Sequence, residues 1–166
     1  MRIVLQSVND ELPLSVLFFR NSFGFCESDE FLIKILKLAI NNIEARAGIS
    51  ILKKEWKVVH NNYQIFLKNG PVNEVVSIKN SKGKNIVPLS TVRKQDNLLL
   101  TFEEDLGFIT IYYKTGYDSC NLPECLKNNI ISEFLNVYDK NEKIIEKDKN
   151  NFVLNLNNSS KIFVYG

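Results

Sequence analysis

The side chains best suited to catalysis or metal binding are one histidine, His60, and three cysteines, Cys26, Cys120 and Cys125. Together they would supply the four ligands of a structural zinc ion. However, four residues separate Cys120 from Cys125, a wider spacing than zinc-ligand pairs usually show. Cys125 also falls on the expected inward face of a helix, where a small apolar side chain packs. We therefore predict no metal site.

His60 is the residue that a hydrolytic triad or a Cys–His nucleophile would have to use. It alternates with Trp56 and Val58, which places it on the apolar face of a predicted strand. A general base or a metal ligand could stand there, but a packed structural histidine is the more common case. The sequence around it lacks a nucleophile elbow or an activated cysteine. We predict no catalytic residues and no enzymatic activity.

Acidic residues and glycines give no sign of a substrate or cofactor site either. Glu103, Glu104 and Asp105 are consecutive in a predicted turn, whereas acid–base pairs converge from separate elements into a cleft. Gly83 lies between lysines in another predicted turn, and no helix follows it as one would follow a phosphate-binding loop. We therefore predict that the protein needs no cofactor.

Lys79, Lys82 and Lys84 form a compact basic cluster in the middle of the chain. They could face DNA and contact its phosphates if several subunits surrounded the duplex. The alternative is a solvated hairpin tip, which is the commoner setting for lysines on turns, and the interleaved aromatics of a single-strand-binding groove are missing here. The class of function that remains is binding or assembly.

The composition is that of an ordinary globular domain, with 166 residues, 45% hydrophobic and 24% charged. The net charge of +2 is too balanced to steer the protein to nucleic acid or membranes by bulk electrostatics. The N-terminus lacks the features of a secretory leader, and every apolar run is far shorter than the ~20 residues that cross a bilayer. We expect a soluble, intracellular protein without a membrane partner.

Two long helices and a short one are expected from the spacing of apolar residues. Residues 14–20 suit the short, buried helix. The clearest helix begins after Ser28, a capping residue, and ends at Gly48, because apolar residues between them recur at steps of three and four. The second long helix begins near Glu124 and runs to about Asp139.

Between these helices the pattern changes to the two-residue alternation of strands. Residues 56–60 and 63–67 alternate on either side of Asn61-Asn62, which predicts a hairpin. Further strands are predicted around residues 76–78, 98–102 and 108–113, with a tight turn at residues 80–84. We expect these strands to form a small antiparallel sheet.

After the last long helix, residues 140–151 are dense in charge and asparagine, which predicts a frayed helix end or a linker. Residues 152–154 and 162–165 would permit a terminal hairpin. The prediction is an α+β fold: a small helical bundle, made of two long helices and a short N-terminal one, with an inserted antiparallel sheet or hairpin region. Residues 1–139 would form the domain, and residues 140–166 a charged linker and an apolar C-terminal segment.

The stretch Ile-Thr-Ile-Tyr-Tyr-Lys-Thr-Gly-Tyr at residues 109–117, followed by Leu-Pro-Glu-Cys-Leu-Lys at 122–127, resembles a signature of the head-tail connector (adaptor) proteins of long-tailed bacteriophages and gene transfer agents. In that family a strand ends in a Tyr-x-x-Gly-Tyr corner, and a helix entered through proline follows. Glycine permits the sharp corner, tyrosines pack across it, and proline sets the helix entry. The corresponding residues here are Tyr113, Gly116, Tyr117 and Pro123.

Weaker features of the family also occur in the same order along this chain, and the resemblance covers roughly residues 12–139. They include Glu44 and Gly48 at the end of a helix, then Trp56 in the first strand. The chain departs from the family at Ile49, where an arginine is common, and at its C-terminus, where Val164 and Gly166 replace proline and arginine.

The resemblance implies a structural subunit that assembles as a ring of about twelve copies under the portal, extends the DNA channel and joins the tail. The implied partners are further copies of itself, the portal protein, a stopper or tail-completion protein, and DNA that passes without sequence-specific binding. The implied location is the bacterial cytoplasm during assembly, then the head–tail interface of a phage, prophage or gene transfer agent particle.

The apolar C-terminal segment is the candidate portal contact, through Phe152, Leu154, Phe163 and Tyr165. The alternative is that these residues pack on the sheet of their own chain. A rival function is that of a nucleic-acid-binding accessory protein of a mobile element, which would use the hairpin that carries Lys79, Lys82 and Lys84.

Overall fold

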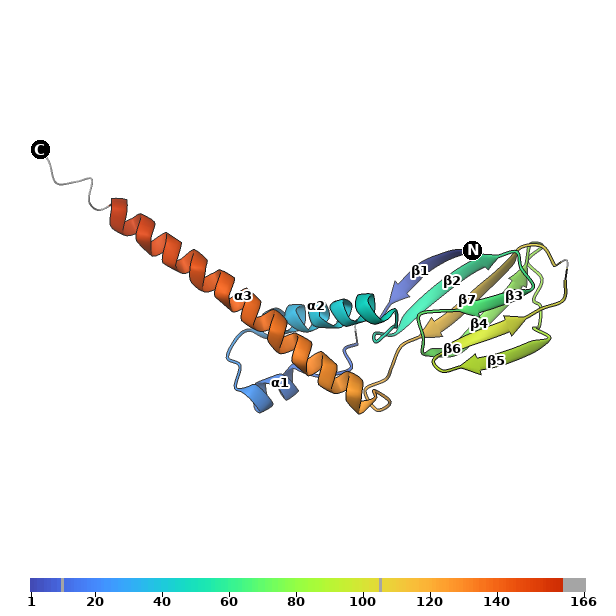
Figure 1. Cartoon of the computed structure of the whole chain (residues 1–166), viewed down its shortest axis with the longest axis horizontal. Coiled ribbons are helices and arrows are strands. Elements are labelled where there is room, and N and C mark those ends of the chain that lie inside the picture. Colours follow the sequence, from blue (N-terminus) through green and yellow to red (C-terminus); the bar gives the residue numbers. More distant parts are fainter. Residues whose placement is uncertain (10, 105, 160–166) are drawn as a thin grey trace, which may run out of the picture.

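The computed structural model describes residues 1–9, 11–104 and 106–159, and of residues 142–159 the backbone alone. A helical part and a β part lie end to end (Figure 1). The helices are α1 (Val16–Phe23), α2 (Asp29–Ala47) and α3 (Glu124–Ser159). The strands are β1 (Arg2–Val8), β2 (Lys54–His60), β3 (Gln64–Leu67), β4 (Val72–Asn80), β5 (Ser90–Lys94), β6 (Asn97–Thr101) and β7 (Ile109–Thr115). Among the described residues, none of the helices combines the length and hydropathy that a membrane span requires.

The ends of α2 lie where the sequence predicts them. Ser28 Oγ accepts a hydrogen bond from the Phe31 amide at 3.3 Å and so satisfies one of the free N–H groups of the first turn. At the other end Gly48 adopts φ 65°, and its amide donates to the Glu44 carbonyl at 2.9 Å. Both the capping residue and the glycine stop are confirmed.

The helical part has its own hydrophobic core, formed where α1 and α3 pack on α2. Phe19 of α1 stacks on Phe134 of α3 with ring centroids 4.1 Å apart. Across the α2–α3 contact, the Glu133 carboxylate accepts hydrogen bonds from Asn42 at 2.9 Å and Arg46 at 2.8 Å, and these bonds lower the pKa of Glu133. The buried residues of this core are Leu14, Phe19, Leu32, Ile35, Leu36, Ala39, Ile40, Ile43, Ile51, Leu52, Ile130, Phe134, Val137 and Tyr138.

The β part consists of two antiparallel sheets, with strand orders β1-β2-β7-β4 and β3-β6-β5. Val58 pairs with Ile111 and Trp56 with Tyr113, so these side chains share one face of the larger sheet. That face packs against the smaller sheet. The buried residues of this second core are Val58, Ile65, Leu67, Val72, Leu98, Leu100, Phe102, Ile109, Ile111 and Tyr113.

The predicted helical bundle with an inserted sheet is therefore wrong. Within the described residues, seven strands form two antiparallel sheets that enclose a core separate from that of the three helices. Two strands were not predicted. In β1 the pairing slips between Leu5 and Ser7, which breaks the alternation of its side chains, and all five residues of β5 are exposed, so neither shows the pattern of a half-buried strand.

The predicted hairpin across Asn61-Asn62 is also wrong. Strand β2 pairs with β1 and β7, whereas β3 pairs with β6, so the turn carries the chain from one sheet to the other. The strands predicted at 98–102 and 108–113 correspond to β6 and β7, which likewise belong to different sheets. Alternation shows which side chains of a strand share a face, but it does not identify the neighbouring strand.

Where a frayed helix end or a charged linker was predicted, followed by the first strand of a possible terminal hairpin, α3 continues as a helix to Ser159. The lysines and glutamates of this stretch are good helix formers, which fits the observed backbone. At roughly 1.5 Å per residue, the helix is about 54 Å long. Its C-terminal half projects beyond α1 and α2 (Figure 1). Residues 160–166 lie outside the described residues.

A buried carboxylate joins α2 to the β part. Glu44, in the last turn of α2, is only 7% exposed. Its Oε1 accepts hydrogen bonds from the backbone amides of Ile51 at 2.6 Å and Leu52 at 3.0 Å, and its Oε2 pairs with Nζ of Lys54 at the start of β2. A buried charge is tolerated when it is paired and hydrogen-bonded in this way.

The variant Glu44→Gln tests this junction. It removes the counter-ion of the largely buried Lys54 and leaves fewer acceptors for the two amides, so the free energy of unfolding should fall by about 2–4 kcal/mol. Urea unfolding followed by circular dichroism measures the loss. The control Glu74→Gln breaks an exposed pair with Lys114 at 3.1 Å and should cost less than about 1 kcal/mol. Equal losses in the two variants would contradict the special role of Glu44.

Candidate assembly surfaces

The corner after β7 lies where the helical and β parts meet. Gly116 adopts φ +105°, and a Cβ on it would lie 2.3 Å from the carbonyl oxygen of Leu52. Its amide donates to the carbonyl of Pro71 at 3.2 Å. Both the backbone conformation and the close approach require glycine at this position.

Two tyrosines flank this glycine, as the resemblance implies. Tyr113 is fully buried, and its hydroxyl donates to the carbonyl of Lys68 at 3.1 Å. The backbone amide of Tyr117 donates to the carbonyl of Ile51 at 3.1 Å, next to the amides that Glu44 holds. Pro123 stands one residue before α3, and its carbonyl accepts from Lys127 at 3.0 Å. These residues lie along the path from sheet to helix, where they form part of the scaffold rather than an exposed surface.

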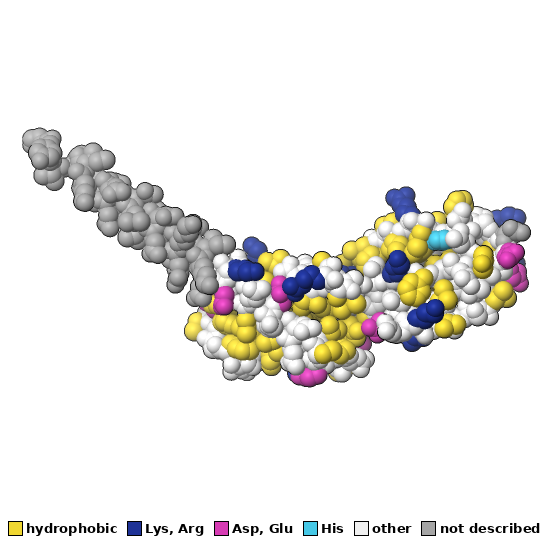
Figure 2. Space-filling model, viewed as in Figure 1, with side chains coloured by type: hydrophobic (Ala, Val, Ile, Leu, Met, Phe, Trp, Pro, Cys, Tyr) yellow, Lys and Arg dark blue, Asp and Glu magenta, His cyan; other side chains and the backbone are white. Residues whose placement is uncertain are grey.

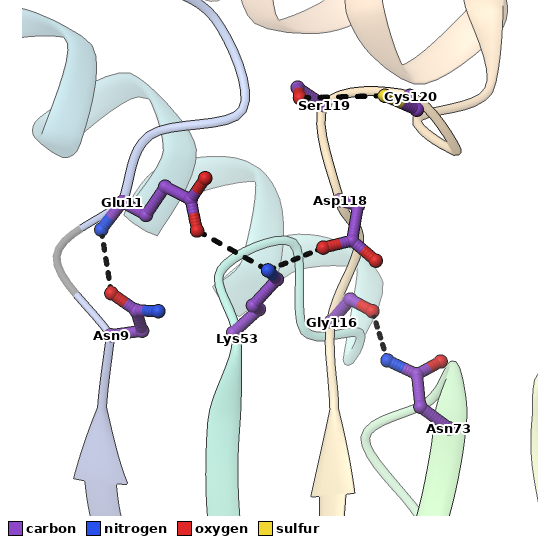
Figure 3. Close-up of polar contacts among 8 residues, drawn as sticks. All are labelled: Asn9, Glu11, Lys53, Asn73, Gly116, Asp118, Ser119 and Cys120. Atoms are coloured by element: carbon purple, nitrogen blue, oxygen red, sulfur yellow. Dashed lines mark hydrogen bonds and ion pairs between the residues drawn. The ribbon is translucent and has the colours of Figure 1, made fainter.

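An ion-pair bridge ties together the loops at the same junction (Figure 3). Nζ of Lys53 lies 3.3 Å from Oε2 of Glu11 and also pairs with Asp118. Hydrogen bonds to Asp118 and Glu11 raise the pKa of Lys53. Beside it, the side-chain amide of Asn73 donates to the carbonyl of Gly116. Sequence reasoning missed this bridge, because partners so far apart in the chain leave no local signal.

A cavity of about 360 Å³ lies at the junction end of the larger sheet. Its lining carries charges of both signs, and Lys114 pairs with Glu74 within it at 3.1 Å. Such a mixed lining does not favour an anionic or a cationic ligand. The charged residues that line it are Lys53, Lys54, Glu55, Glu74 and Lys114.

The residues considered for metal binding are not brought together. In the part of the chain that the structure describes, there is no group of three or more His, Cys, Asp or Glu residues that could hold a metal ion. Cys26, Cys120 and Cys125 are all exposed, so the expectation that Cys125 packs inward is wrong. Nδ1 of His60 accepts a hydrogen bond from the Asn62 amide at 2.9 Å, and partial burial lowers the pKa of its imidazole.

The basic cluster lies at the end of the sheet that is farthest from the helices. Asn80, the last residue of β4, pairs with Ile109, the first residue of β7. The turn that follows is confirmed, since Oδ1 of Asn80 accepts from the amides of Lys82 and Lys84, each at 3.0 Å. Lys79, Lys82 and Lys84 are all exposed.

Large apolar side chains are exposed in both parts of the molecule. Leu17 and Phe23 of α1 are 63% and 42% exposed, and near the hairpin Val87, Leu89 and Phe108 are 86%, 66% and 60% exposed. On the face shown in Figure 2, hydrophobic side chains reach the surface of both the helical and the β part, with lysines and arginines among them. Contiguous exposed apolar patches are typical of surfaces that meet other proteins, whereas single exposed apolar side chains are common on any protein.

The residues predicted to contact a portal are only partly placed. Phe152 and Leu154 fall in the stretch of α3 whose backbone alone is described. Phe163 and Tyr165 lie outside the described residues. Their role stays a prediction.

Comparison with solved structures finds the same fold in particles of gene transfer agents. A chain in the neck of an empty particle, computed with C6 symmetry, matches with a TM-score of 0.68 and 16% identity, over 84% of each chain. A chain in the virion of a native particle matches with a TM-score of 0.66, 16% identity and the same coverage. A chain in the neck of a native particle, computed with C12 symmetry, matches with a TM-score of 0.61 and 16% identity, over 81% of this chain and 84% of that chain. No protein-family model and no curated protein matches the sequence.

The variant Gly116→Ala tests the close approach at the corner. The new Cβ would overlap the Leu52 carbonyl at a positive φ, so the free energy of unfolding should fall by about 2–4 kcal/mol. The matched control is Gly24→Ala, which also has a positive φ, +72°, but no atom within 4 Å of the new Cβ. The control should lose only about 1 kcal/mol in the same chemical unfolding assay. A corner variant no less stable than the control would contradict the steric argument.

Tyr113 should make stability depend on alkaline pH. Burial raises its pKa from 10.0 to about 12. The folded protein therefore holds this proton more tightly, and stability that is complete below pH 10 is lost as the pH rises toward 12. Tyr113→Phe should flatten the decline, although Tyr117, whose pKa burial also raises, leaves part of it. Urea unfolding at a series of pH values measures both slopes, and identical slopes would refute the assignment.

Proposed function

We propose that this protein is a structural, non-catalytic subunit of the neck of a gene transfer agent, phage or prophage particle. In this proposal it is the adaptor, which forms a ring of about twelve copies under the portal and joins the head to the tail. The observation that carries the proposal is the fold shared with neck chains, at a TM-score of 0.68 over 84% of each chain.

The connector-like corner supports the same class of function from the sequence. Tyr113, Gly116 and Tyr117 match the family signature, and they lie in a turn whose geometry requires glycine. The signature was recognised from the residues alone, whereas the fold similarity rests on the backbone at 16% identity. Two largely separate kinds of evidence therefore favour a head–tail connector.

The β part offers two different surfaces for a ring contact. In a cyclic ring neighbours meet head to tail, so each copy needs two distinct complementary patches. Strand β1 forms one edge of the larger sheet and β4 the other. Strand β5 lies on the β4 side, since Nη2 of Arg93 donates to the carbonyl of Val72 at 3.0 Å. Edge strands carry unpaired backbone groups, so we assign β1 and β5 to opposite sides of the subunit contact.

The C-terminal arm is the proposed portal contact. We divide the chain into residues 1–139, which form the body of the subunit, and residues 140–166, which reach the portal. The projection of α3 beyond the other helices supports this division (Figure 1). The proposed contact residues are Phe152, Leu154, Phe163 and Tyr165. Further proposed partners are a stopper or tail-completion protein and the DNA that passes through the ring.

Deleting residues 151–166 tests both the arm and the ring. The full chain, co-expressed with the portal protein encoded nearest its own gene, should give rings on the portal in electron micrographs. The deletion variant should lose portal association but keep its free energy of unfolding, because both described cores end before residue 139. Unchanged portal binding with reduced stability would mean instead that the segment packs on its own chain. Absence of any ring with the full chain would overturn the adaptor proposal.

A further inference from the structure

The β1-β2-β7-β4 sheet has one covered face and one open face. Along β7, Ile109, Ile111 and Tyr113 are buried against the smaller sheet, and the intervening residues point the other way. Nζ of Lys57 lies over the ring of Tyr112, 5.6 Å from its centroid, which places both side chains on the open face. None of the described helices or strands packs over this side.

The open face carries cations and hydroxyl groups, with one valine in each of its two rows farther from the helices. One cross-strand row runs Arg2, Val59, Thr110, Lys79, and the next runs Val4, Lys57, Tyr112, Ser77. Arg2 and Lys79 are exposed, and the described residues contain no ion-pair partner for either. Beyond Lys79, the hairpin adds Lys82 and Lys84.

Acidic residues are confined to the margins of this face. Glu55 and Glu74 lie in the row nearest the helices, where Lys114 pairs with Glu74 at 3.1 Å. Glu103 and Glu104 lie on the connection from β6 to β7, outside the strands of this sheet. The two rows farther from the helices carry no carboxylate.

We propose that this open face binds the phosphate backbone of duplex DNA without reading its bases. Lysines, arginines and hydroxyl side chains are the usual partners of phosphate oxygens. Four strands about 4.8 Å apart make a surface about 14 Å wide between the outer strands, before side chains are added. Such a surface is too wide to enter a major groove of about 12 Å, so the base edges stay out of reach.

The inference extends the proposed function, because the open face would then line the channel of the ring. Contact by one subunit is weak, but copies in a closed ring act on the same duplex, and their contacts reinforce one another. Binding that ignores sequence suits DNA that must pass through. The binding itself is a property of the single subunit and can be measured without the ring.

Charge reversal on the face provides the test. The face variant is Arg2→Glu with Lys57→Glu, and the control is Lys34→Glu with Lys140→Glu, which makes the same change of charge on exposed positions of the helices. Fluorescence anisotropy with a short labelled duplex at low salt should show binding by the full chain that weakens as salt rises. The face variant should bind at least about ten-fold more weakly, with a log–log salt slope smaller by about 2. The control variant should bind the labelled duplex as tightly as the unchanged full chain does. The unchanged full chain should bind a duplex of unrelated sequence equally tightly.

Two results would overturn the inference. If the control loses as much affinity as the face variant, bulk charge rather than this face binds DNA. If Lys82→Glu with Lys84→Glu abolishes DNA binding while the face variant still binds, the hairpin alone is the binding site. That result would favour the rival function, an accessory DNA-binding protein. Ring formation is scored separately by electron microscopy. A chain that binds DNA through this face but never forms rings upholds the inference and refutes the neck role, whereas rings without DNA binding refute the inference alone.

Discussion

The arrangement of the molecule depends on how one buried carboxylate is satisfied. The two hydrophobic cores share no buried residue, so the relation between them is fixed by the short connections at the junction. Glu44 holds the connection from α2 to β2 by accepting from the amides of Ile51 and Leu52 and by pairing with Lys54. The return connection through Gly116 then packs on the Leu52 carbonyl that this network has placed. One side chain thus orders two of the three crossings between the parts, those from α2 to β2 and from β7 to α3.

This separation of cores suits the function proposed above, in which the protein acts through its surfaces. Each part is stabilised by its own buried residues. The strand edges, the C-terminal arm and the open sheet face can therefore contact other molecules. The Glu44–Lys54 pair at the junction and the exposed bridge around Lys53 contribute differently to stability. Lys53 is about one-third exposed, where solvent screens an ion pair, whereas the Glu44–Lys54 pair is largely shielded from water.

Features with a local chemical cause could be predicted from the sequence. Ser28 and Gly48 mark the ends of α2 because capping depends on a few adjacent residues, and the turn after Asn80 follows from turn chemistry alone. The corner could be recognised because its glycine and tyrosines are close in sequence. Strand pairing could not, since nothing near β3 indicates that its partner is β6. No local sequence pattern indicates the slipped pairing in β1, the exposed strand β5 or the distant partners of Lys53. The mixed charge of residues 140–159 did not distinguish a continuous helix from a frayed end or a linker.

The length of α3 has a mechanical consequence. Among the described side chains of α3, Tyr138 is the last that belongs to the core, and about 20 further residues extend for roughly 30 Å. A rod held at one end is a lever: a tilt of about 10° at the anchor moves its tip by about 5 Å over that length. Small adjustments where Phe134 meets Phe19 are therefore amplified at the far end. In the ring proposed above, such levers would follow the contour of the partner surface while the sheets beneath them kept their places.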